Sequence, residues 1–474
     1  MFAADLCKKY SLVFTFLLFS VFSSTNLPAV GLYSSSFNVP YGTLDGMGLA
    51  LGGYPLDVAM NPANLSESDG TKIEIGGSLP YMHIRYQDIY LDTDPKVAYT
   101  NDEKINMPVI LPHLGVSIPV NEKLSYGAAF YVLGGAGLDI EGIRRQTPTG
   151  QTLNDWAGTT LPVTGDLRQI KENISTRFFI FKLTNALAYD FGKFSVGAGI
   201  EINYAQHDTR YEYRDLSGNF RVPGKGFDYK SDPAFSPGGI FGITYRLTEK
   251  TRVAYSYQTT SHLPLNGRSK FNMDRPDQFY LESNVSYIFK LPERHNAGIA
   301  FITNDWKFVL DASYLKYAST NSTIKQILEY PLLETPLGNT NQMVGHLNAK
   351  DVIMAGGGTE YKPDKIAYRA GYSYSSLLIG EDASAPMLAG VLHQHIFFTG
   401  LGIDMGKYEI NLGYNHLFER TLKGSDMSDW DISHSMYPVR STDDLDWDHI
   451  RMPFYSHKTS FAVDVLLIGL VIKY

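Results

Sequence analysis

Stretches in which apolar residues alternate with polar or small ones recur along most of the chain. Every second residue of the stretch 194–204 is apolar, and Ser, Gly, Glu and Asn stand between them. The same period of two occurs at 306–314, 366–374 and 408–414. Successive side chains of a β-strand point to opposite faces, so each stretch predicts a strand with one apolar and one polar face. The chain is therefore expected to be all-β.

The connections decide between a soluble sandwich and a membrane barrel, because both fit this alternation. Short polar turns recur at 121–123, 192–193, 248–250, 304–305, 363–364 and 405–406. Long polar connections lie between them, at 87–107, 139–176, 208–235, 266–278, 319–350, 381–394 and 421–453. Short turns at one end and long loops at the other are typical of outer-membrane barrels, whose turns are periplasmic. We therefore predict a transmembrane antiparallel β-barrel of about 14 strands over residues 71–474, an even number as such barrels have.

The beginning of the chain has the pattern of an export signal. Lys8 and Lys9 precede an apolar run at 12–22, which is too short to span a bilayer as a helix. Residues 1–29 are expected to be a cleaved signal peptide, the alternative being a buried N-terminal helix. No later stretch holds 18 consecutive apolar residues, which excludes a helical membrane protein. The expected location is the bacterial outer membrane.

A glycine-rich segment at 41–65 lies between the signal and the first strand. It is too rich in Gly for a stable helix and too rich in Leu, Met, Val and Tyr for a free linker. We expect residues 30–70 to form a hatch, or plug, inside the barrel. Asn61, Pro62 and Ala63 are expected to anchor its end as a turn or helix start. Apolar side chains would line a ligand path, or else only fill space against the inner wall: Met47, Leu49, Leu51, Tyr54, Leu56, Val58 and Met60.

Composition narrows the possible chemistry. The net charge of −8 gives no basic character that would suit nucleic acid. The one cysteine, Cys7, lies in the expected signal, so disulfide and zinc-thiolate chemistry are not expected in the mature chain. No nucleophile elbow, phosphate loop or dinucleotide fingerprint occurs. His393 and His395 share a strand face without a third ligand. We therefore expect neither an enzyme, nor a cofactor, nor a metal site.

Several blocks of the sequence resemble the long-chain fatty-acid and hydrocarbon transporters of outer membranes, the FadL/TodX family. The resemblance runs from about Gly42 to Tyr474. It rests on the tripeptide 61–63 and on the blocks 111–135, 186–204, 238–259, 291–301 and 368–375. It implies a fourteen-stranded barrel closed by an N-terminal hatch, with hydrophobic ligand leaving sideways through a gap at a kinked third strand.

The resemblance and the residue types together suggest two kinds of site. Gly134, Gly135 and Gly137 would form the lateral port, since glycine in a strand marks bulges and bends, although an ordinary strand end is equally compatible. A fatty-acid carboxylate should meet a buried cation. Candidates on predicted inward faces are Arg252, Lys307 and Arg369, which could instead pair with interior acids such as Glu201, Asp311 and Glu409.

The expected function is uptake of hydrophobic compounds, foremost long-chain fatty acids, by passive diffusion. The alternative is a surface-exposed binding protein or adhesin that acts through its long loops. The cargo could be a fatty acid, an alkane or an aromatic compound. Further expected partners are outer-membrane lipid and lipopolysaccharide. The barrel-assembly machinery is also expected to bind, by recognising the alternating C-terminal strand that ends at Tyr474. A monomer is expected.

Overall fold

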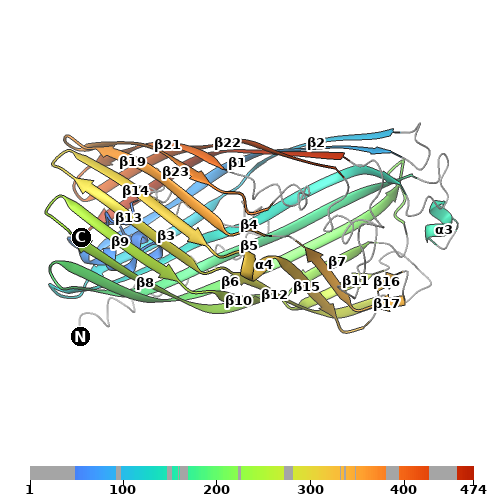
Figure 1. The fold of residues 1–474 in the computed structure, drawn as a ribbon, viewed down its shortest axis with the longest axis horizontal. Coiled ribbons are helices and arrows are strands. Elements are labelled where there is room, and N and C mark those ends of the chain that lie inside the picture. The colour runs from blue at the N-terminus through green and yellow to red at the C-terminus, as the bar shows by residue number, and fades with distance from the viewer. Residues whose placement is uncertain are drawn as a thin grey trace.

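The described strands form one antiparallel sheet that closes on itself (Figure 1). The computed structural model describes residues 48–91, 98–146, 152–157, 160, 169–222, 226–271, 281–330, 333–335, 338–346, 349–379, 394–425 and 456–474. Pairing of β1 with β23, from Lys72 opposite Lys473 to Ile89 opposite Ser456, completes the circle. The predicted signal peptide, the first part of the predicted hatch, Met47 and His393 lie outside the described residues.

The wall has fourteen strands, some of them interrupted by an irregularity. In chain order they are β1 (Lys72–Leu91), β2 and β3 (Ala98–Pro108, Leu111–Pro119), β4 (Leu124–Gln146), β5 (Gln169–Asp190), β6 (Phe194–Asp215), β7 and β8 (Phe227–Ser231, Ala234–Arg246), β9 to β11 (Thr251–Gln258, Ser261–Pro264, Gly267–Phe271), β12 and β13 (Leu281–Leu291, Arg294–Ile302), β14 and β15 (Trp306–Leu315, Thr323–Leu328), β18 and β19 (Gln342–His346, Val352–Tyr361), β20 (Ile366–Ser375), β21 (His395–Asp404), β22 (Tyr408–Ser425) and β23 (Ser456–Lys473). The predicted antiparallel barrel of about 14 strands is confirmed.

The remaining elements are small. They are the 3-10 helices η1 (Pro55–Ala59) and η2 (Pro62–Glu67), the helices α3 (Leu153–Ala157) and α4 (Ala318–Asn321), and a hairpin of β16 (Leu333–Thr335) and β17 (Gly338–Thr340). Among the described residues, no helix has the length and apolar character needed to cross a membrane.

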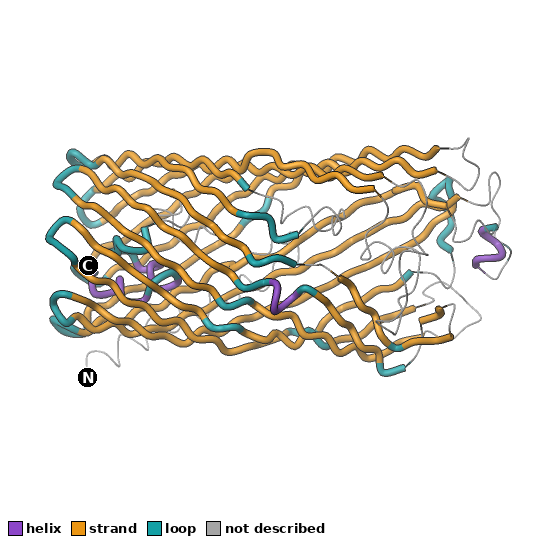
Figure 2. The backbone as a smooth tube through the Cα atoms, viewed as in Figure 1, coloured by secondary structure: helices purple, strands orange, loops and turns teal. Residues whose placement is uncertain are grey.

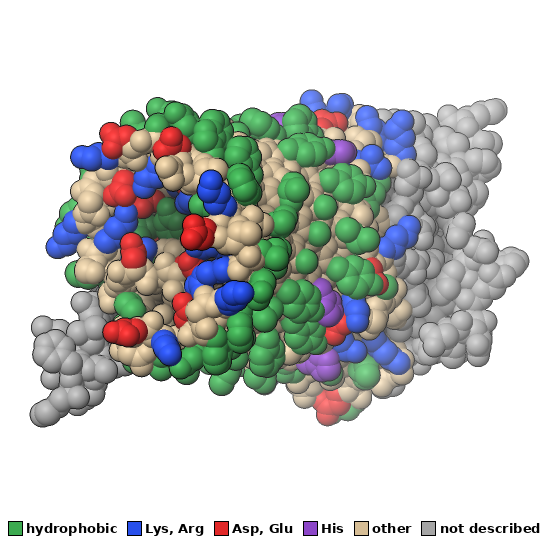
Figure 3. Space-filling model, turned by 60° about the vertical axis from the view of Figure 1, so that its left-hand side comes forward, with side chains coloured by type: hydrophobic (Ala, Val, Ile, Leu, Met, Phe, Trp, Pro, Cys, Tyr) green, Lys and Arg blue, Asp and Glu red, His purple; other side chains and the backbone are tan. Residues whose placement is uncertain are grey.

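The alternation predicted from the sequence places polar residues inside and apolar residues outside. On β6 the outward Ile200 is 66% exposed, whereas Glu201 and Asn203 are fully buried. Leu310 on β14 is 64% exposed in the same way. This arrangement is the reverse of a soluble sandwich, and the exposed apolar side chains form a band across the face that Figure 3 shows. The band is the surface that faces lipid.

Aromatic residues mark both edges of the band. Tyr189 on β5 lies near the short turns, and Phe179 lies ten residues away on the same outward face. Ten residues span about 33 Å along a strand, or about 25 Å along the axis at a tilt of about 40°. That is the height of the apolar band in outer-membrane barrels. At the edge away from the short turns, outward histidines join the tyrosines, as where the Tyr255 hydroxyl lies 2.8 Å from His295 Nδ1.

All the predicted short turns lie at one end of the barrel (Figure 2). In the first of them, Asn121 Oδ1 accepts hydrogen bonds from the backbone N–H groups of Lys123 and Leu124, each at 2.9 Å. Gly192, in the second, has φ +93°, which favours glycine. Local side-chain bonds and glycine therefore make these turns tight.

The bounds of the long connections differ from the prediction. Strand β4 runs on to Gln146 and β5 begins at Gln169, although 139–176 was predicted to be a loop. Strands β1, β2, β6, β7, β11, β15, β18 and β22 also enter predicted loops. These extensions lie beyond the apolar band, where water replaces lipid and the outward face is polar. The apolar alternation therefore ends before the strands do.

Candidate functional site

Residues 48–67 lie within the barrel at its short-turn end, where they bond to inward-facing side chains (Figure 1). Asp311 Oδ2 on β14 accepts hydrogen bonds from the backbone N–H of Gly48 at 2.5 Å and of Leu49 at 3.0 Å. The hydroxyl of Tyr54 donates to Glu409 Oε1 on β22 at 2.7 Å. These contacts tie the segment to two separate strands of the wall.

Asn61 caps the second short helix and bonds to the wall. Its Oδ1 accepts from Ala63 N at 3.1 Å, and its Nδ2 donates to Leu49 O at 3.2 Å and to Thr244 Oγ1 on β8 at 2.9 Å. Pro62 occupies the first turn of η2, where its fixed φ suits a helix start. The structure thus places the predicted anchor residues at a helix start in direct contact with the barrel.

Glycines on the inward face let this segment approach the wall, a signal that the sequence analysis missed. A Cβ added to Gly242 on β8 would lie 1.9 Å from Asn61 Oδ1. A Cβ added to Gly197 on β6 would lie 2.4 Å from Ala63 N. Neither contact is sterically possible, so the close approach of the segment requires glycine at both positions. Glycine at inward positions of neighbouring strands could have indicated the docking surface.

Arg252, one predicted ligand for a carboxylate, instead holds this segment. Its Nη1 lies 2.8 Å from Glu67 Oε2 and donates to Leu51 O at 2.9 Å. Arg246 contributes a second contact to the same carboxylate, with Nη2 2.5 Å from Glu67 Oε1. Glu67 therefore joins two wall arginines to the end of η2.

Lys307 and Arg369, the other two candidates, share one buried carboxylate. Lys307 Nζ lies 2.7 Å from Glu360 Oε1, and Arg369 Nε lies 2.6 Å from Glu360 Oε2. Arg369 also donates to Asn411 Oδ1 at 2.8 Å. Both cations thus belong to an interior polar network of the kind that the sequence left open as their alternative.

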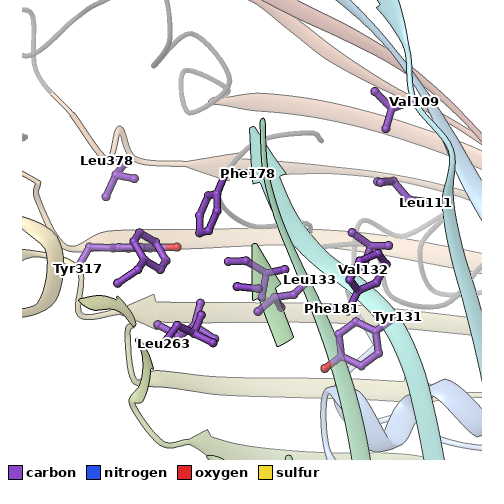
Figure 4. Packing of buried hydrophobic residues seen from close by; sticks show 14 of the residues in the cluster. Val109, Leu111, Tyr131, Val132, Leu133, Phe178, Phe181, Leu263, Tyr317 and Leu378 are labelled. Atoms are coloured by element: carbon purple, nitrogen blue, oxygen red, sulfur yellow. The ribbon is translucent and has the colours of Figure 1, made fainter. Parts of the chain in front are cut away.

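An apolar cluster fills the middle of the lumen, next to the N-terminal segment. It brings together Leu133, Phe178, Leu263, Tyr317 and Leu378 from separate parts of the wall (Figure 4). Of the residues predicted to line a ligand path, Leu56 and Val58 belong to this cluster, and Met60 packs against it. Leu49 and Leu51 belong to a smaller cluster with Ala254, Ala300, Val309 and Phe398, against which Tyr54 packs.

Strand β4, the third strand of the wall, changes course beside this cluster. Its ladder with β3 ends at Tyr131 opposite His113. Its ladder with β5 shifts register between Val132 and Gly134, so that Leu133 is one extra residue. Such a bulge bends the strand that carries it. Gly134 and Gly135, two of the predicted port residues, follow immediately, opposite Ile180 and Phe179, and Gly137 lies opposite Arg177.

The wall lacks strand pairing on one side of this stretch. Within residues 98–146, all of which are described, β2 pairs with β1, and no ladder joins β2 to β4. Further along, a side chain joins the two strands. The Asn101 side chain on β2 accepts a hydrogen bond from the backbone N–H of Arg144 on β4 at 2.8 Å and donates one to its carbonyl oxygen at 3.1 Å. Between Tyr131 and Arg144 the edge of β4 therefore faces β2 without backbone hydrogen bonds to it.

Apolar side chains cover this interruption. Val132 and Phe181 occupy outward positions but are only 7% and 5% exposed, whereas the outward Leu187 is 52% exposed. Phe181 stacks on Phe130 with ring centroids 5.7 Å apart. Val132 and Phe181 also belong to the same apolar cluster as Leu133 and Phe178 (Figure 4). In the sequence, the run 178–181 is apolar at every position, and this break in the alternation could have indicated the apolar cluster on both faces of the wall.

Comparison with solved structures identifies the architecture. A FadL homologue of Pseudomonas aeruginosa matches with a TM-score of 0.67 at 14% identity, over 94% of this chain and 99% of that one. The toluene transporter TodX of P. putida matches with a TM-score of 0.65 at 15% identity, over 93% and 99%. The toluene transporter TbuX of Ralstonia pickettii matches with a TM-score of 0.56 at 16% identity, over 93% and 99%.

No protein-family model and no curated protein sequence matches this chain. The three solved structures are those of transporters or a transporter homologue, not of enzymes. Their likeness extends over nearly the whole chain and confirms, at the level of fold, the resemblance that the sequence blocks indicated. The chain has the fold of the FadL and TodX outer-membrane barrels.

Proposed function

We propose that this protein admits hydrophobic compounds across the outer membrane by passive diffusion, with a lateral exit beside β4. One observation carries the proposal. A single apolar cluster joins Leu133 and Phe178 in the lumen to Val132 and Phe181 on the outward face, at the place where the ladder between β2 and β4 is interrupted. Each buried CH2 group of a cargo would gain about 0.8 kcal/mol along such a path.

The N-terminal segment acts as a hatch in this proposal. Its bonds to Asp311, Thr244 and Glu409 keep it across the short-turn end of the lumen. A cargo that leaves sideways above the segment does not have to break these polar contacts. The hatch then blocks water and ions while the apolar path stays available.

The interior charges favour uncharged cargo. Arg252 contacts Glu67, and Lys307 and Arg369 contact Glu360, so a fatty-acid carboxylate would have to compete with these acids. Hydrocarbons are therefore the first candidates and long-chain fatty acids the second. The names of the similar structures TodX and TbuX, both toluene transporters, support this order.

The test removes the bulge. Deletion of Leu133 should remove the first of two register shifts between β4 and β5, close the wall at this point and lower the uptake of labelled toluene severalfold. Deletion of Glu419 is the matched control, because β22 also carries one extra residue between Leu417 and Arg420 but keeps β23 as a partner. Labelled oleate run in parallel separates the two cargo classes. Uptake that is unchanged by the Leu133 deletion, in a barrel that still resists heat in detergent, would refute lateral exit.

A further inference from the structure

The extended halves of four neighbouring strands carry a concentration of positive charge. Among the described residues, outward positions of β5, β6, β7 and β11, together with Arg221 after β6, hold eight cations and three acids. The cations form the "basic face": Lys171, Arg177, Arg210, Arg214, Arg221, Lys230, Arg268 and Lys270. The acids are Asp208, Glu212 and Asp228. Two of these cations have ion-pair partners on adjacent strands, Arg177 with Asp139 on β4 at 3.8 Å and Lys270 with Glu282 on β12 at 3.1 Å. The remaining excess is notable in a chain whose net charge is −8.

Several of these cations stand directly opposite one another in the sheet. Lys171 pairs with Arg214, Arg214 forms a bridge with Arg221, and Lys230 pairs with Arg268. Like charges directly opposite each other destabilise a sheet. Three such juxtapositions on one face favour the binding of an anion from outside the chain.

One acid holds the centre of the basic face together. Glu212, which is 7% exposed, contacts the guanidinium groups of three arginines. Its Oε2 lies 3.1 Å from Arg210 Nη2, its Oε1 lies 3.0 Å from Arg221 Nε, and Arg214 is the third partner. One carboxylate offsets only one of three positive charges. Arg210 also lies opposite Asp228 in the ladder with β7, so the cluster brings three arginines together with two acids.

The basic face begins where the apolar band ends. Arg177 is two residues from Phe179, whose ring stacks on Tyr204 with centroids 6.1 Å apart. Lys171 is eight residues from Phe179, which corresponds to about 27 Å along the strand and about 20 Å along the axis. Figure 3 shows basic and histidine side chains following the apolar band on the side away from the short turns.

We propose that the basic face binds the phosphate groups of lipopolysaccharide in the outer leaflet. At this height the outer leaflet presents phosphorylated sugars just above its acyl chains. Five of the eight cations are arginines, whose planar fork binds phosphate through two parallel hydrogen bonds. The site is distinct from the cargo path and does not depend on the transport proposal.

The test measures binding of purified rough lipopolysaccharide to the full chain in detergent micelles. In one variant, R210Q/E212Q/R214Q/R221Q, the central carboxylate is removed with its arginines, so that no buried acid is left unpaired. A second variant, K230Q/R268Q, changes two exposed side chains outside that cluster. Each is expected to bind about tenfold more weakly or worse, since hydrogen bonds between charged groups are about twice as strong as those between neutral groups.

The control is K123Q/K193Q/K250Q, which removes three exposed lysines from the short turns and should bind as the parent chain does. The same lipopolysaccharide after dephosphorylation should lose most of its affinity for the parent chain. Equal binding of the phosphorylated and dephosphorylated forms would overturn the proposal. Equal affinity for alginate, a polyanion without phosphate, would also overturn it, as would parent-like binding by both basic-face variants.

Discussion

Arg252 Nη1 lies 2.8 Å from Glu67 Oε2, joining the barrel wall to the segment that occupies its lumen. The two side chains are 22% and 13% exposed, so solvent screens their attraction only in part. Arg246 contacts the same carboxylate, and Arg252 also donates to Leu51 O. Arg252 therefore links both ends of the segment 48–67 to the wall.

Replacement of Arg252 by Gln should loosen the segment without unfolding the barrel. Glu67 keeps Arg246 as a partner, but Leu51 loses a charged donor, which contributes about 1.5 to 3 kcal/mol. Amide hydrogen exchange within residues 48–67 should become about tenfold faster or more. Lys250→Gln, an exposed change on the same hairpin, is the control. Identical exchange in the parent chain and Arg252→Gln would show that the contacts of Arg252 do not hold the segment.

Gly242→Ala should displace the Asn61 anchor. The new Cβ would lie 1.9 Å from Asn61 Oδ1, and such overpacking costs about 1 to 3 kcal/mol. Gly239→Ala is a matched control on the same strand, because its Cβ would meet side chains at an ordinary 3.5 Å. Urea unfolding in detergent should separate the two variants. Equal stability of the two variants would contradict the predicted clash with Asn61.

Lys182 and Glu201 form a buried ion pair on the inner wall, with Nζ 2.8 Å from Oε2 and side chains 4% and 0% exposed. Breaking such a pair by changing one partner costs about 3 to 5 kcal/mol, because the other charge remains buried. Glu201→Gln should therefore destabilise the barrel strongly in the same unfolding assay. The double variant K182M/E201L should recover most of the loss. A Glu201→Gln barrel as stable as the parent would indicate that the lysine is hydrated.

Val132→Asp should block the proposed lateral path. Val132 is an outward residue that is only 7% exposed, so a carboxylate there would meet apolar neighbours and any passing hydrocarbon. A buried unpaired charge costs several kcal/mol, and uptake of toluene should fall about tenfold or more. Val132→Thr, which keeps the shape without the charge, is the control. Full uptake by Val132→Asp, at equal surface abundance, would place the path elsewhere.

The barrel was predictable because a strand that crosses lipid must alternate apolar outward residues with polar or small inward ones. Residues 194–204 show this alternation, and glycine or Asn at the turns marks where one strand ends and the next begins. The strand extensions beyond the apolar band face water and lack this alternation, and so β2 and β7 were predicted to be loops. The partners of the interior cations were also out of reach, because Arg252 and Glu67 are far apart in the chain. Only the folded wall brings them together.

The course of β4 shows how far local patterns extend. Glycines at 134, 135 and 137 indicated an irregular strand, but no pattern fixed which neighbour loses its ladder. The loss of the ladder depends on how β2, β4 and β5 are aligned with one another. The extra residue, Leu133, ends a run at 128–133 in which every residue is apolar, so the sequence does not distinguish it from its neighbours. It becomes visible only when Val132 and Gly134 are matched with Phe181 and Ile180.

Closure of the wall has a consequence for biogenesis. The segment 48–67 leads directly into β1. Strand β1 pairs along its length with β23, which has 18 residues and is the last strand in the chain order. The lumen around Asn61 is thus enclosed only when the final strand has been made and paired. Residues 48–67, which are made before the wall, are therefore among the last to have their surroundings completed. A chain that lacks β23 would expose the edge of β1 and leave the segment without an enclosing wall.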